Sequence, residues 1–165
     1  MPPDTHQAPA TPATTMVSFA LESTSGGINA LSALGGKVVV LFYEERTHTA
    51  DNDELRRLLA RYVRDHDLAE QLAVVPIANV SSYNFRPASD IARTAVRAVA
   101  RRVGAEILLD WAGVLEAPPF SFSRGASNVA LVDRAGRLVW HHAGRVLGPA
   151  RTELFRALER ALGDS

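Results

Sequence analysis

The chain of 165 residues contains no cysteine. This absence excludes disulfides, thiolate metal ligands and every reaction that begins with a thiolate nucleophile. Net charge is also missing, because 18 basic residues balance 18 acidic ones, so the broad positive field of a non-specific nucleic-acid binder is absent. No apolar run approaches the ~20 residues that span a bilayer. We therefore expect neither nucleic acid nor a membrane among the partners.

The first fifteen residues, 1–15, contain four prolines and no large apolar side chain beyond Met1. They lack both the basic start and the apolar stretch of a secretory signal. We therefore predict a disordered leader over 1–15, a single domain over 16–165 and a cytoplasmic location.

The first half of the chain predicts alternating strands and helices. Residues 37–43 and 72–80 are apolar, β-branched runs typical of buried strands, with Pro76 requiring a bulge or an unpaired N–H. Between them an amphipathic helix is predicted, where Asp51 and Glu54 resemble a capping box. Weaker patterns predict a short edge strand over 16–21 and a turn of helix over 28–34.

The second half gives a stronger local signal. A helix capped by Ser89 and ending at Gly104 carries an apolar stripe, and a strand over 106–110 and a loop over 111–125 follow. The stripe consists of Ile91, Ala95, Val96, Val99 and Val103. Residues 128–132 and 137–141, joined by an Asp-Arg-Ala-Gly connection, predict a β-hairpin before a last amphipathic helix. The order β-α-β-α-β-β-β-α indicates an α/β domain with one mixed sheet.

Two stretches carry a resemblance to a known family. Residues 28–43, INALSALGGKVVVLFY, and residues 127–144, SNVALVDRAGRLVWHHAG, resemble the lead-in and hairpin motifs of the thioredoxin-like superfamily, in its TlpA and peroxiredoxin branches. The resemblance covers roughly 17–162. It implies a three-layer α/β/α sandwich with a mixed central sheet, a C-terminal β-hairpin and a closing helix.

The same resemblance implies that the redox centre has been lost. Aligning Phe42 and Tyr43 with the family's Phe-Trp pair places Thr47 and Ala50 at the two positions of the Cys-x-x-Cys motif, and Ser127 at the cis-proline. A threonine hydroxyl has neither the nucleophilicity nor the redox chemistry of a thiolate. We therefore expect a degenerate member without oxidoreductase or peroxidase activity.

Other chemistry is still open in the loop over 44–53. Carboxylates flank His48 there and can form an acid–base or metal site, or a solvated loop whose acids complement the following helix N-terminus. These carboxylates are Glu44, Glu45, Asp51 and Asp53. His141 and His142 are neighbours on a strand and point to opposite faces, so they cannot chelate one ion. No metal and no cofactor is predicted.

In the thioredoxin-like fold a substrate groove lies beside the dithiol. The residues predicted to line it here are Tyr43, Glu44, His48, Tyr83, Phe85, Trp111 and Phe120. An aromatic groove can bind a peptide or a small apolar ligand, although the same side chains can instead fill space under a long loop. Arg93, Arg97 and Arg101 form a basic helical stripe that either faces an acidic partner or is simply solvated.

The leading prediction is a redox-inactive thioredoxin-like domain that acts as a binding module, with a protein partner or a second copy of itself. One alternative is an enzyme whose non-thiol chemistry is built on the loop over 44–53, and another is a structural subunit of a larger assembly. Exposed aromatics beside the loop favour the first and a perturbed carboxylate–histidine pair in a cleft favours the second. A large apolar face outside the groove favours the third.

Overall fold

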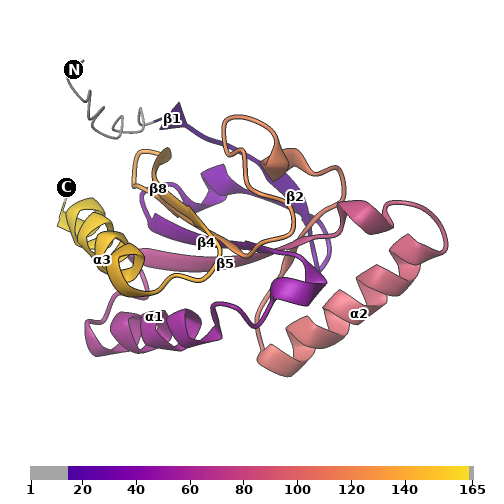
Figure 1. The fold of residues 1–165 in the computed structure, drawn as a ribbon, viewed down its shortest axis with the longest axis horizontal. Helices are drawn as coiled ribbons and strands as arrows, with labels where there is room; N and C mark the ends of the chain where they lie inside the picture. Colours follow the sequence, from indigo (N-terminus) through magenta and orange to yellow (C-terminus); the bar gives the residue numbers. More distant parts are fainter. Residues whose placement is uncertain (1–14, 164–165) are drawn as a thin grey trace, which may run out of the picture.

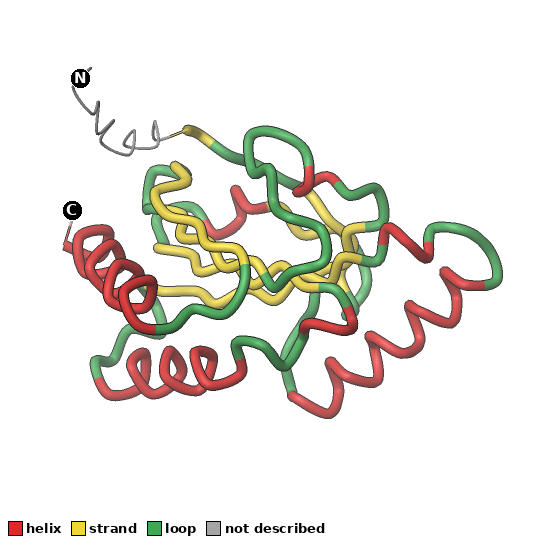
Figure 2. Tube along the Cα trace, viewed as in Figure 1, coloured by secondary structure: helices red, strands yellow, loops and turns green. Residues whose placement is uncertain are grey.

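The computed structural model describes residues 15–163, which form one mixed sheet of eight strands and three α-helices (Figure 1, Figure 2). The strands are β1 (Thr15–Met16), β2 (Ala20–Ser23), β3 (Ile28–Ala30), β4 (Val38–Glu44), β5 (Leu72–Asn79), β6 (Leu108–Asp110), β7 (Asn128–Val132) and β8 (Arg137–Ala143). The α-helices are α1 (Asp53–Asp65), α2 (Ala88–Val103) and α3 (Gly148–Gly163). Their order in the sheet is β1-β8-β7-β4-β5-β6-β2-β3, which confirms the mixed α/β class.

The strand β4 lies near the middle of the sheet, parallel to β5 and antiparallel to β7. All seven of its residues are buried. Because side chains alternate along a strand, Val40 and Phe42 pack against the helices, while Leu41 and Tyr43 pack on the opposite face of the sheet. This two-sided burial explains the uninterrupted apolar run from which the central strand was predicted.

The helices gather on one face of the sheet. The parallel strands β4, β5 and β6 are neighbours in chain order, joined first by α1 and then by α2. Because such crossovers are right-handed and both step the same way across the sheet, α1 and α2 lie on the same face. Figure 1 shows both below the sheet. Leu55 and Leu59 of α1 join Leu154 and Leu158 of α3 in one core cluster against β4.

Loops and short 3₁₀ helices cover the other face. Two of these 3₁₀ helices, η1 (Leu31–Leu34) and η4 (Val114–Glu116), each contribute a buried leucine to this layer, whereas η2 (Arg46–His48) and η3 (Ser81–Tyr83) bury no residue. Phe19, Leu115, Phe120 and Phe122 are buried in this layer, and the Phe120 ring lies 5.3 Å from that of Phe122 and 6.1 Å from that of Phe19. The sheet thus lies between a helical layer and a layer of loops.

The N-terminal segment differs from the prediction. The single edge strand expected over 16–21 is wrong: β1 pairs with β8 at one end of the sheet, whereas β2 pairs with β3 and β6 at the other. Val17 and Phe19 between them are buried, because this segment crosses the face of the sheet opposite the helices and contributes to the core there. The last residue of the predicted leader, Thr15, belongs to β1 and pairs with Leu138 of β8. Residues 1–14 of the predicted leader lie outside the described residues.

Three further local predictions meet a different geometry. The segment 28–34, expected to be helical, divides into β3 and η1. Helix α1 begins at Asp53 after Asn52, so the capping box at Asp51 is wrong, and the Asp51 carboxylate pairs with His48 instead. Helix α2 begins at Ala88, and Ser89, predicted as its cap, lies inside it.

Pro76 sits in β5 without a bulge. The register from β4 to β5 continues through Pro76, which lies opposite Phe42. β6 pairs only with Ile77, Ala78 and Asn79, so at Pro76 one edge of the strand has no neighbour and needs no N–H donor.

None of the helices that the structure describes is both long enough and apolar enough to cross a membrane.

Candidate functional site

A buried polar network lies where β4 ends and α1 begins. Asn52, directly before α1, is buried, and its Nδ2 donates to Ser127 Oγ at 2.8 Å and to the Gly144 carbonyl at 3.1 Å. Its Oδ1 accepts the backbone N–H of Val146 at 2.8 Å. One side chain therefore ties the start of α1 to the segments on either side of the β7–β8 hairpin.

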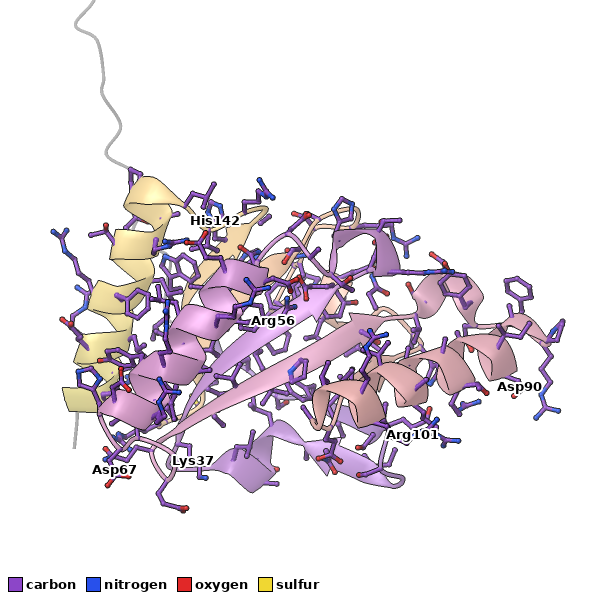
Figure 3. All side chains as sticks on the ribbon, turned by 90° about the horizontal axis from the view of Figure 1, so that it is seen from below. Lys37, Arg56, Asp67, Asp90, Arg101 and His142 are labelled. Carbon is purple, nitrogen blue, oxygen red and sulfur yellow. The ribbon has the colours of Figure 1, made fainter. Side chains whose placement is uncertain are left out.

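Ser127 connects this amide to a carboxylate. Its fully buried hydroxyl donates to Glu44 Oε2 at 2.6 Å while it accepts from Asn52. The other oxygen of Glu44 forms an ion pair with Arg56 of α1, which Figure 3 labels near the end of β4. A hydrogen-bonded hydroxyl and a paired carboxylate satisfy the requirement that buried polar groups have partners.

Arg56 is held on several sides. Its guanidinium carbon lies 4.6 Å from the centre of the Phe42 ring, and its Nη1 donates to the Thr49 carbonyl at 2.8 Å and to Asp53 at 2.9 Å. Burial lowers the pKa of Arg56, although a guanidinium remains charged at any physiological pH. The cation therefore neutralises Glu44 inside the network.

The two positions predicted to correspond to the dithiol lie outside this buried network. Thr47 is exposed in η2, and Ala50 is exposed in the turn before α1. The side chains that contact Ser127 in this network are Asn52 and Glu44. Sequence reasoning missed Asn52 and Arg56 as members of this site, because no local pattern connects Asn52 with a serine 75 residues away.

The acidic residues of the loop over 44–53 do not converge on His48. His48 Nδ1 lies 3.0 Å from Asp51 Oδ2, with both side chains about one-third exposed. Glu45 accepts the backbone N–H of Gly125, and Asp53 pairs with Arg56. Within residues 15–163, no three His, Asp or Glu side chains are grouped so that they can hold a metal ion.

The residues predicted to line a groove fall into different environments. Tyr43 and Phe120 are core residues, and Glu44 belongs to the buried network. The Tyr43 hydroxyl donates to buried Asp110 at 2.8 Å, and burial together with this bond raises the pKa of Tyr43 above its ordinary value. Tyr83, the last residue of η3, and Phe85, two residues after it, are exposed.

Trp111, also predicted for the groove, is part of a surface cluster. Its indole Nε1 donates to Glu22, and Arg93 of α2 lies 4.9 Å from its ring centre. Arg93 also holds both carboxylate oxygens of Glu22, at 2.9 and 3.2 Å. One member of the predicted basic stripe therefore fastens α2 to β2.

Comparison of the sequence with known proteins gives no match, either to a family model or to a curated protein. Comparison of the structure does. A protein of Neisseria meningitidis assigned as a thioredoxin superposes with a TM-score of 0.65 at 17% identity, over 93% of each chain. A protein of Chlorobium tepidum assigned as the thiol:disulfide interchange protein DsbE gives 0.62 at 21% identity, over 91% of this chain and 96% of that one. The protein has a thioredoxin-like fold.

A third structure of the same fold is the exposed lipoprotein thioredoxin Etrx1 of Streptococcus pneumoniae, with a TM-score of 0.59 at 17% identity over 87% of this chain and 99% of that one. At these identities the likeness establishes the thioredoxin-like fold and leaves the activity open. The names of all three neighbours refer to thioredoxins or thiol:disulfide exchange, whereas this thioredoxin-like chain has no cysteine.

Proposed function

We propose that this protein is a redox-inactive thioredoxin-like domain that acts by binding another protein. The observation that carries the proposal is the closed network of Glu44, Asn52 and Ser127 at the start of α1. Thiol–disulfide exchange requires a thiolate, and the chain has no cysteine at any position. The domain therefore works through its surface.

The network also argues against an enzyme built on the same residues. A nucleophilic hydroxyl must reach a substrate and pass its proton to a base. Ser127 beside Glu44 superficially resembles such a pair, but the serine has no exposed surface and Arg56 neutralises the carboxylate. The hydroxyl consequently has a structural role.

The exposed apolar surface supports a protein partner. Four apolar side chains on α2 or just before it are exposed: Phe85 (62%), Ile91 (67%), Val99 (36%) and Val103 (58%). Exposed apolar residues that occur together mark interaction surfaces far more often than isolated ones do. Ile91, Val99 and Val103 lie outside the predicted groove, so they also support the second candidate, a subunit of a larger assembly.

The test compares two isoleucines that are equally exposed. Ile91 of α2 and Ile28 of β3 are both 67% exposed, so aspartate at either position removes a similar apolar surface. Tagged wild type, Ile91→Asp and Ile28→Asp are cross-linked in native extract, and the size and composition of the complexes are measured. We expect a complex in wild type and Ile28→Asp that Ile91→Asp has lost.

Two controls accompany this experiment. Circular dichroism must show that all three proteins are folded, and an insulin-reduction assay is expected to give no turnover above a heat-treated sample. Identical complexes in all three proteins, or none in any, would refute binding through α2. Robust disulfide reduction by protein freed of contaminating thioredoxins would refute redox inactivity.

A further inference from the structure

The helical face of the sheet is incompletely covered over β5. Val74 lies in register with Val40 of β4, so both side chains point toward the helices. Val40 is fully buried, whereas Val74 is 38% exposed. Val74 is exposed even though its strand, β5, lies between β4 and β6 in the sheet. Parallel strands of this kind are normally covered on both faces. Figure 3 shows β5 running between α1 and α2.

The apolar flank of α2 faces this uncovered strand. Arg93 fixes the opposite flank through its contacts with Glu22 and Trp111. Asp90 and Arg101, labelled in Figure 3, lie on the side of α2 turned away from α1. At 100° per residue, Val99 and Val103 are therefore on the flank toward β5, whereas Ile91 lies half a turn from buried Ala100 and points away from the sheet.

The facing flank of α1 is basic. Tyr62 of α1 packs edge-on against Phe155 of α3, with ring centres 5.5 Å apart. The flank of α1 that carries Tyr62 therefore faces α3. Ala60 lies on the other flank, bordered by Arg57 and Arg64 three and four residues away. Within the described part of the chain, Arg57 forms no ion pair, and the same is true of Arg102 on α2.

We propose that an acidic amphipathic helix of a partner protein docks on this surface, which we call the β5 surface: Val74, Val99 and Val103 with the rim residues Arg57 and Arg102. This inference rests on the proposed function and names the partner's chemistry. The apolar side of the helix covers Val74 and the flank of α2, and its carboxylates meet the two arginines. A third helix completes the layer that α1 and α2 leave open over β5.

Charge selects this occupant over a second copy of the chain. In a two-fold pair of β5 surfaces the arginines of one copy, Arg57 and Arg102, would face the same two arginines of the other copy, which is unfavourable. Asp53, the acid of α1 nearest this surface, already pairs with Arg56 of the same helix, whereas Asp65 lies with Tyr62 and Phe155 on the flank toward α3. Asp90 lies on the side of α2 turned away from α1, so it does not neutralise the positive charge of Arg57 and Arg102.

The test uses two synthetic peptides of eighteen residues with the same leucine stripe at helical spacing. One carries glutamate at its polar positions and the other lysine, and each has a fluorescent label for anisotropy titration against the full chain. We expect the glutamate peptide to bind about tenfold or more tightly than the lysine peptide, since reversing the sign at two exposed rim contacts turns attraction into repulsion. Raising the salt concentration should reduce this difference.

Variants assign the binding to the β5 surface. Val99→Asp should weaken the glutamate peptide about tenfold, and Arg102→Glu should weaken it while strengthening the lysine peptide. Ile28→Asp, on β3 at the end of the sheet, should change neither affinity. Circular dichroism confirms that each variant is folded.

Three outcomes would overturn the proposal. The first is equal or tighter binding of the lysine peptide, and the second is binding of neither peptide. The third is a wild-type dimer in sedimentation equilibrium that Val99→Asp dissociates, because a second copy would then cover the surface. In the first two cases the proposed function stands if Ile91→Asp still loses its complex in extract, so the two failures are distinguishable.

Discussion

Replacing Asn52 by alanine removes the side chain that joins the start of α1 to the hairpin. The change deletes the donors to Ser127 Oγ and the Gly144 carbonyl and the acceptor of the Val146 N–H. Val146 is almost completely buried, so water cannot readily replace the lost acceptor. We therefore expect a loss of stability well above that of a typical surface substitution.

The size of the loss follows from the three bonds. Two hydrogen bonds at about 1 kcal/mol each, plus about 1–2 kcal/mol for the Val146 N–H left unsatisfied, give about 3–4 kcal/mol. Because a chain of this size loses about 2–4 °C of melting temperature per kcal/mol, the midpoint should fall by about 6–16 °C. Asn84→Ala is the matched control, since Asn84 is exposed and should change stability by no more than about 0.5 kcal/mol.

The measurement is urea unfolding followed by the fluorescence of Trp111 and Trp140, with thermal unfolding as a second probe. If Asn52→Ala lost less than about 1 kcal/mol, or no more than Asn84→Ala, the network would not hold α1 to the hairpin. The structural argument for a closed, unreactive site would then be refuted.

Three further predictions concern stability. Tyr43→Phe should lower the free energy of unfolding by about 2 kcal/mol in urea titrations, because it removes a hydroxyl donor from buried Asp110; no loss would show that this bond is unimportant. Burial, aided by the nearby charge of His142, lowers the pKa of His141, so the stability its neutral ring contributes is present above the unfolded pKa and is lost as pH falls toward the folded pKa. The urea concentration at the midpoint of unfolding should therefore decrease as the pH is lowered from about 7 to about 5, and it should decrease less steeply in His141→Gln. Parallel plots of midpoint against pH for the two proteins would contradict this. Gly136→Ala should cost about 1–2 kcal/mol, since φ is +83° at the hairpin turn, and an unchanged melting temperature would refute the strain.

The elements predicted correctly from the sequence are those specified by short-range interactions. The hairpin of β7 and β8 follows from two apolar runs around Asp133–Gly136, where the Asp133 carboxylate accepts the backbone N–H groups of Ala135 and Arg137. The central strand β4 follows from its continuous apolar run, since burial on both faces requires no alternation. Both signals are contained in fewer than about fifteen consecutive residues, so they persist whatever the rest of the chain does.

The position of the apolar stripe of α2 shows the limit of that reasoning. Periodicity correctly puts Ile91, Val99 and Val103 on one side of a helix, but it does not say which side meets the sheet. The contact of Arg93 with Glu22, 71 residues away, decides that orientation and leaves the stripe exposed.

The candidate site was decided almost entirely by tertiary structure. The sequence determined that this chain supplies no thiol of its own, because it contains no cysteine whatever the fold. It did not reveal the network, since Asn52, Ser127 and Glu44 meet only when the sheet brings the end of β4 next to β7. A hydrogen bond between distant residues depends on three-dimensional position and produces no periodic pattern in the sequence. The absence of cysteine, by contrast, can be read directly from the composition.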